Sequence, residues 1–85
     1  MNRINDGVDT ATTLPGISLI EIYGKNRILI ENHKGISGYE DGQIQVKVDF
    51  GCVIICGEKL KLRNMSKSRL VITGKVNTVN LHGRG

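Results

Sequence analysis

One short pattern recurs in this chain: an isoleucine, any residue and a glycine, followed each time by a lysine or a glutamate. The three copies are Ile22-Tyr23-Gly24, Ile55-Cys56-Gly57 and Ile72-Thr73-Gly74. Each copy closes a short apolar run rich in β-branched residues, and another such run starts within a few residues. Glycine adopts positive φ without a steric penalty, so it lets a strand reverse direction tightly. The pattern therefore predicts short strands with turns at Gly24, Gly57 and Gly74.

The residues available for a core also favour a sheet. Among the 85 residues only Tyr23, Tyr39 and Phe50 are aromatic, so the core must consist of Ile, Val and Leu. Side chains branched at Cβ fit a pleated surface and lose rotamer freedom in helices. Turn signals recur about every 8 to 12 residues. We expect an all-β fold, a small antiparallel meander of about eight short strands that forms a sandwich, roll or barrel, with a short β-solenoid as the alternative.

Three local patterns make specific structural predictions. Alternation over residues 43–50 predicts a strand with one face on the core, formed by Ile44, Val46, Val48 and Phe50. The continuous apolar run at residues 52–56 predicts the most buried strand. Near the end of the chain Val76 and Val79 are out of phase, which predicts a β-bulge near Asn77 and Thr78.

The distribution of polar residues predicts the domain boundaries. Residues 1–13 are small and polar and are expected to form a flexible N-terminal arm, residues 14–82 a single all-β domain, and residues 83–85 a frayed tail. The arm has no apolar segment of the kind that secretory signals contain, and no run of about 18 apolar residues occurs. We expect a cytoplasmic protein.

Cys52 and Cys56 are four residues apart in a predicted strand. Their Cα atoms would then lie roughly 13 Å apart, beyond the separation of about 7 Å that a disulfide tolerates. The same separation prevents the two thiols from chelating one metal ion. We expect two reduced thiols that pack as small apolar side chains.

The positive charge of the chain is concentrated in its last third. The net charge is +4, but residues 1–57 carry −2 and residues 58–85 carry +6. Lys59, Lys61 and Arg63 alternate along one predicted strand, and Arg69 and Lys75 belong to its neighbours. Three interpretations stay open: a solvated edge whose lysines block aggregation, a contact with an acidic protein or an anionic membrane, and a contact with nucleic acid. The last is the least favoured, because no aromatic residue for base stacking follows Phe50.

The residues that carry chemistry do not form a recognisable catalytic set. The two histidines fall in a predicted turn (His33) and beside the predicted tail (His82), and phosphate-cradling glycine motifs are absent. We expect no enzymatic activity, no cofactor and no metal site. For His33 two interpretations are open: its ring bonds backbone groups of its own turn, or it forms with Lys34 a loop contact for a partner.

Several stretches resemble the YabP/YqfC family of bacterial sporulation proteins. They are Ile30-Glu31-Asn32-His33-Lys34-Gly35-Ile36, Tyr39, Gly51, Ile55-Cys56-Gly57, Leu60-Lys61-Leu62, Met65 and Leu70-Val71-Ile72-Thr73-Gly74-Lys75-Val76. The first stretch is closer to the YqfC branch, and the resemblance covers roughly residues 14–81. Residues 2–13 depart from the family, whose longer members have a more apolar or helical lead-in.

The resemblance implies a short, non-enzymatic protein made in the mother cell of an endospore former and linked to the spore envelope. Some members are encoded beside integral membrane sporulation proteins. We therefore expect an assembly or adaptor module in cortex or coat formation, with a membrane-embedded sporulation protein as partner and homo-oligomers formed through sheet edges. The alternatives are a peripheral binder of anionic membrane and, more weakly, a small nucleic-acid-binding β-barrel.

Overall fold

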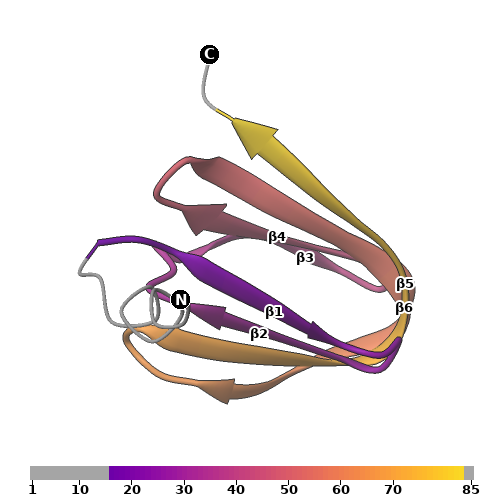
Figure 1. The fold of residues 1–85 in the computed structure, drawn as a ribbon. Helices are drawn as coiled ribbons and strands as arrows, with labels where there is room; N and C mark the ends of the chain where they lie inside the picture. The colour runs from indigo at the N-terminus through magenta and orange to yellow at the C-terminus, as the bar shows by residue number, and fades with distance from the viewer. Residues whose placement is uncertain (1–15, 84–85) are drawn as a thin grey trace, which may run out of the picture.

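The structure is a computed structural model that describes residues 16–83 (Figure 1). These residues form six strands: β1 (Leu19–Tyr23), β2 (Arg27–Glu31), β3 (Ile36–Glu40), β4 (Gln43–Val48), β5 (Gly51–Met65) and β6 (Arg69–Gly83). The expected N-terminal arm, residues 1–13, and the last two residues of the expected tail lie outside the described part. The prediction of an all-β fold is confirmed, since residues 16–83 contain no helix.

The six strands form one antiparallel sheet in the order β1-β2-β6-β5-β4-β3. β1 and β2 are a hairpin, and β3 to β6 follow one another as a meander. Because β6 pairs with β2, residues 32–35 must cross from β2 to the opposite edge of the sheet, where β3 begins. The sheet is open and entirely antiparallel, so it is neither a closed barrel nor a solenoid.

The number of strands is smaller than predicted because Gly57 and Gly74 bend strands and do not end them. β5 and β6 have 15 residues each, and each strand continues without interruption past its glycine. The bent hairpin folds the sheet over on itself into two layers (Figure 1). The β4 layer contains β3, β4 and residues 51–57 and 75–83; the β2 layer contains β1, β2 and residues 60–65 and 69–73.

Close backbone contacts explain the two glycines at the bend. A Cβ on Gly57 would overlap the carbonyl oxygen of Lys75, and Gly74 has a φ of 133°. The β5–β6 register shifts between Cys56 and Gly57 and again between Glu58 and Lys61, so the bend consists of consecutive β-bulges. The bulge predicted near Asn77 is confirmed, because it is the residue skipped by the first shift. Only the first glycine motif makes the turn that the pattern predicts, at Gly24 between β1 and β2.

The core lies between the two layers and is entirely aliphatic. Its buried members are Ile28, Ile30, Ile44, Val46, Val48, Val53, Ile55, Leu60, Leu70 and Ile72. The predicted alternation in β4 is confirmed except at Phe50, which lies in the turn after the strand and is 36 % exposed. The prediction for residues 52–56 is wrong in part: Val53 and Ile55 are buried, but the residues between and beside them are half-buried. The reason is that each layer covers only one face of the other.

The chain end also differs from the prediction. β6 continues to Gly83, with His82 opposite Cys52 and Gly83 opposite Gly51. Gly83 is therefore a strand residue and does not belong to a frayed tail, because the first half of β5 gives it a pairing partner.

Candidate functional site

Three of the five predicted contact cations share the outer face of the β2 layer. Ile72 is buried in the core, so its neighbour Thr73 points outward. Lys61 lies directly opposite Thr73 in the β5–β6 pairing, and Arg63 Nε donates a hydrogen bond to Thr73 Oγ1 at 3.2 Å. Arg69 lies on the same side of β6 as Thr73, four residues away. The strand pairing thus brings these three cations onto one surface.

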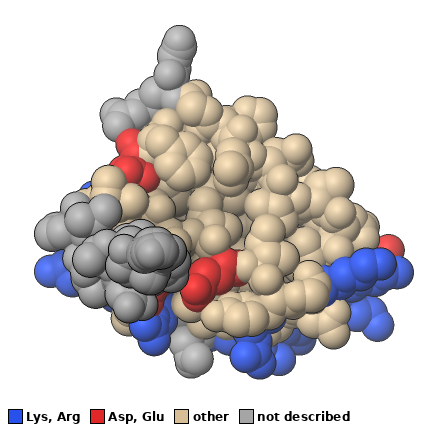
Figure 2. All heavy atoms as spheres, viewed as in Figure 1, with Lys and Arg blue, Asp and Glu red and all other residues tan. Residues whose placement is uncertain are grey.

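The sequence reasoning missed a fourth cation on this surface. Arg27 of β2 pairs with Thr73 from the side opposite to Lys61. Its exposed position before the buried Ile28 was visible in the sequence, but its neighbours were not, because Thr73 is far away along the chain. We call Arg27, Lys61, Arg63 and Arg69 the basic face. Lys and Arg side chains gather along the lower side of the molecule, over the β2 layer, in Figure 2.

Lys59 and Lys75 do not belong to the basic face, contrary to the prediction of a single stripe. Both lie at the bend, where the bulges interrupt the alternation of the strands. Lys59 has a φ of 55°, and Lys75 lies opposite Glu58. The β1–β2 turn joins them there, since the Val76 N–H donates to the Lys25 carbonyl at 2.8 Å. The lysines at residues 25, 59 and 75 form a separate group, the bend lysines.

The basic face also carries acidic groups. Glu31 lies opposite Arg69 and accepts a hydrogen bond from Arg69 Nε at 3.1 Å, within an ion pair that is partly exposed. The Tyr23 hydroxyl donates to Glu21 Oε1 at 2.9 Å. That hydrogen bond is the main reason why the pKa of Tyr23 is raised above 10.0. Among the described residues, the face therefore combines three cations outside any ion pair, one paired cation and a tyrosine whose hydroxyl is oriented.

A shallow hollow lies within the basic face. Its lining combines cationic, aromatic, hydroxyl and aliphatic side chains: Tyr23, Arg27, Leu29, Arg63, Arg69, Val71 and Thr73. Leu29 and Val71 pair across β2 and β6, so they form a half-buried apolar strip between the arginines. Arginine and tyrosine around an apolar centre are the residues enriched where proteins bind each other. The chemistry available here is recognition of a mixed acidic and apolar surface.

The predicted loop contact at His33 is corrected by the structure, because the ring is only 9 % exposed. The Gly35 N–H donates to His33 Nδ1 at 3.0 Å, and Nε2 lies 3.1 Å from the Ser66 carbonyl oxygen. Since Nδ1 accepts a hydrogen bond, Nε2 is the nitrogen that carries the proton and donates to Ser66. His33 therefore connects residues 32–35, the crossing segment, to the β5–β6 turn. This agrees with the interpretation in which the His33 ring bonds backbone groups.

Lys34 is the exposed side chain of this segment, and its backbone is firmly held. The Lys34 N–H donates to the Lys47 carbonyl at 2.7 Å, and the Lys47 N–H donates to the Gly35 carbonyl at 2.8 Å. On the other side of His33, the Asn32 N–H donates to the Ser68 carbonyl at 2.6 Å. These bonds explain the Asn-His-Lys-Gly stretch as the element that ties the two layers together.

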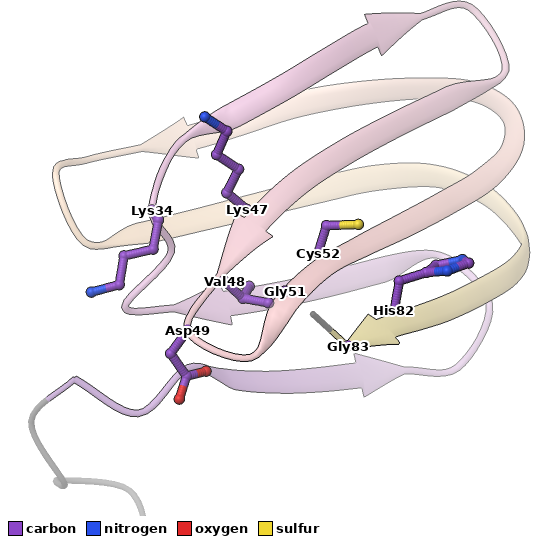
Figure 3. Close-up of a pocket in the computed structure, with 8 residues that line it drawn as sticks. All are labelled: Lys34, Lys47, Val48, Asp49, Gly51, Cys52, His82 and Gly83. Carbon is purple, nitrogen blue, oxygen red and sulfur yellow. The ribbon is translucent and has the colours of Figure 1, made fainter. Parts of the chain in front are cut away.

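A second shallow pocket brings together residues that the sequence analysis considered separately (Figure 3). Cys52 lies on the outer face of the β4 layer. In the strand pairing it is opposite Lys47 of β4 on one side and opposite His82 of β6 on the other. Figure 3 shows that the Lys34 and Lys47 ammonium groups point away from the Cys52 thiol and the His82 ring. Cys52 and Cys56 are both free thiols, as predicted. Within residues 16–83 no three His, Cys, Asp or Glu side chains are grouped to hold a metal ion.

The fold and its surfaces define a small single-sheet β protein whose main distinguishing surface is a mixed cationic and apolar face. The model of the YabP family matches residues 16–85, and the chain belongs to this family. Family membership implies a sporulation-related protein. No curated protein and no solved structure matches the chain. In the described part, residues 16–83, we find no helix suited to crossing a membrane.

Proposed function

We propose that this protein is a non-catalytic assembly or adaptor module in the formation of the spore envelope, the cortex or the coat. Its basic face is the surface that contacts a protein partner. The observation that carries the proposal is the hollow in which three arginines surround the apolar strip of Leu29 and Val71. A partner with acidic groups around an apolar side chain complements this hollow.

The acidic groups on the basic face favour a protein partner over an anionic membrane. Cations near an anionic bilayer contribute about 1 kcal/mol each. Here Glu31 already neutralises Arg69, and the Glu21 carboxylate lies on the same side of the sheet. A protein partner can place an acceptor beside each free cation and leave the glutamates unopposed, whereas a uniformly anionic surface repels both glutamates.

The identity of the partner and its location are part of the proposal. We place the protein in the cytoplasm of the mother cell, with a membrane-embedded sporulation protein as the partner. We also assign it to the YqfC branch of the family, on the basis of the stretch Ile30-Glu31-Asn32-His33-Lys34-Gly35. In this structure that stretch contains the end of β2 and residues 32–35, which cross to the opposite edge of the sheet.

A pull-down from sporulating cells tests the proposal with two charge-reversed variants. The first combines Arg27→Glu, Lys61→Glu and Arg63→Glu on the basic face. The matched control combines Lys25→Glu, Lys47→Glu and Lys67→Glu, three exposed cations outside the basic face that give the same change in net charge. We expect the first variant to lose the partner and the control to retain it.

Two results would contradict the proposal. Equal loss by both variants would show that overall charge, and not the basic face, determines recovery. Co-sedimentation of the purified protein with phosphatidylglycerol vesicles, lost in the first variant while protein recovery is unchanged, would favour the membrane alternative. Circular dichroism of each variant establishes that it retains the β fold.

A further inference from the structure

The sheet leaves several strand edges unpaired. Among residues 16–83, four strand segments have one side without a neighbouring strand: β1, β3, the second half of β5 and the second half of β6. An unpaired edge presents a row of backbone N–H and C=O groups on which another strand can pair. Proteins usually block such edges with charges, bulges or very short strands.

Three of the four edges are blocked in these ways. β1 and β3 have five residues each, and they carry Glu21 and Glu40. The register of β3 is also irregular between Ile36 and Gly38. The second half of β5 carries Lys61 and Arg63, and Lys59 precedes it at the bend. Each of these edges therefore resists the addition of a strand.

The second half of β6 has no such protection. The N–H of Val76 is already bonded to the β1–β2 turn, so the free edge consists of residues 77–83, and we call it the β6 edge. Its residues are Asn77, Thr78, Val79, Asn80, Leu81, His82 and Gly83, with no Lys, Arg, Asp or Glu. The strip of surface along the yellow half of β6 in Figure 1 carries no charged side chain in Figure 2.

Apolar side chains on the β6 edge are incompletely covered. Leu81 pairs with the fully buried Val53, so it faces the inner side of the sheet, yet it is 61 % exposed. Val79, two residues before it on the same side, pairs with the buried Ile55 and is half-buried. An added strand would cover both side chains as well as the free backbone groups.

We propose that the β6 edge pairs with the β6 edge of a second copy of this chain, antiparallel and around a two-fold axis. In such a contact each segment meets an identical segment, so every charged edge would oppose its own charge. The β6 edge is the one free edge of residues 16–83 that escapes this repulsion. The midpoint of residues 77–83 is Asn80, and a register centred there sets Val79 opposite Leu81 of the second copy. This self-association is independent of the proposed adaptor function, since it needs only the purified chain.

Cysteine cross-linking tests the register. In a chain with Cys52→Ser and Cys56→Ser, the variant Asn80→Cys sets two thiols directly opposite, at about 5 Å between Cα atoms, within the range for a disulfide. The matched variant Thr78→Cys sets them roughly 13 Å apart. We expect oxidation to give a covalent dimer with the first variant and not with the second. Equal cross-linking of the two variants would overturn the proposed register.

Sedimentation of the otherwise unchanged chain tests the interface without relying on cysteines. We expect a concentration-dependent species of twice the monomer mass. The substitution Asn80→Lys opposes two cations at the centre of the contact, so it should give a monomer where the parent chain is dimeric. Gln43→Lys adds the same charge on β4, away from any free edge, and should leave the dimer intact. A monomer at every concentration, or a dimer that Asn80→Lys does not weaken, would overturn the proposal.

Discussion

A Cβ atom on Gly74 would lie 2.5 Å from the carbonyl oxygen of Lys59 on the neighbouring strand. The two residues have positive φ, 133° for Gly74 and 55° for Lys59. Their contact is part of the bend that folds the sheet into two layers and sets the basic face on the outside of one of them. The function proposed for the basic face therefore depends on a contact between two backbones.

Gly74→Ala should destabilise the protein by about 3 kcal/mol or more, because it adds a backbone clash to an unfavourable φ. Gly24→Ala is the control, since Gly24 also has positive φ but has open space around it. It should cost about 1–2 kcal/mol. Urea unfolding measures both free energies. Equal effects would mean that φ alone, and not the close contact, requires glycine at the bend.

His33→Ala should lower the free energy of unfolding by about 2 kcal/mol, because it leaves the Gly35 N–H and the Ser66 carbonyl without their partner. Lys34→Ala, at the exposed neighbour, should change it by less than about 0.5 kcal/mol. Both values come from urea unfolding monitored by circular dichroism. If His33→Ala is neutral while it abolishes partner recovery, the ring is a contact residue and our structural assignment is wrong.

Tyr23 should titrate above pH 10.0, because its neutral hydroxyl donates to the Glu21 carboxylate. A raised pKa in the folded state means that this interaction stabilises the fold below pH 10.0 and is lost as the pH rises through the raised pKa. In a Tyr39→Phe chain Tyr23 is the single remaining tyrosine, so absorbance near 295 nm follows it alone. Adding Glu21→Gln should lower the midpoint; an unchanged midpoint would show that the hydrogen bond is not its cause.

Glu31→Gln should release Arg69 without unfolding the sheet. The ion pair is partly exposed, so its loss should cost at most about 1 kcal/mol. The basic face would then have four unpaired cations, and capture of an acidic partner should strengthen and become more sensitive to salt. Binding isotherms at low and physiological salt measure the change. Weaker capture would instead show that the Glu31–Arg69 pair is itself part of the recognised surface.

The predictions from sequence succeeded where local chemistry decides the structure. The alternation of β4 set Ile44, Val46 and Val48 in the core. The phase change between Val76 and Val79 located a real bulge. Each of these depends on side chains within a few residues of one another, which a sequence displays directly.

The candidate site was predicted only in part, because strand pairing determines it. Lys61 and Arg63 alternate visibly along one strand, but Arg27 joins them through its pairing with Thr73. Lys59 and Lys75 were grouped with them by sequence and are separated from them by the bend. The sequence shows His33 in a predicted turn. It does not show that the His33 ring is buried against the Ser66 carbonyl, which is 33 residues away along the chain.

The repeated isoleucine–glycine pattern shows which features the sequence decides and which the tertiary structure decides. By itself the sequence determined that the chain is all-β, which side of β4 faces the core and where glycine is needed. Only the tertiary structure decided that Gly24 turns the chain while Gly57 and Gly74 bend it. All three sites need a residue without a Cβ or with unusual φ, so their local sequences look alike. The difference lies in the neighbouring strand, where the backbone of Lys75 or Lys59 occupies the space that a side chain would take.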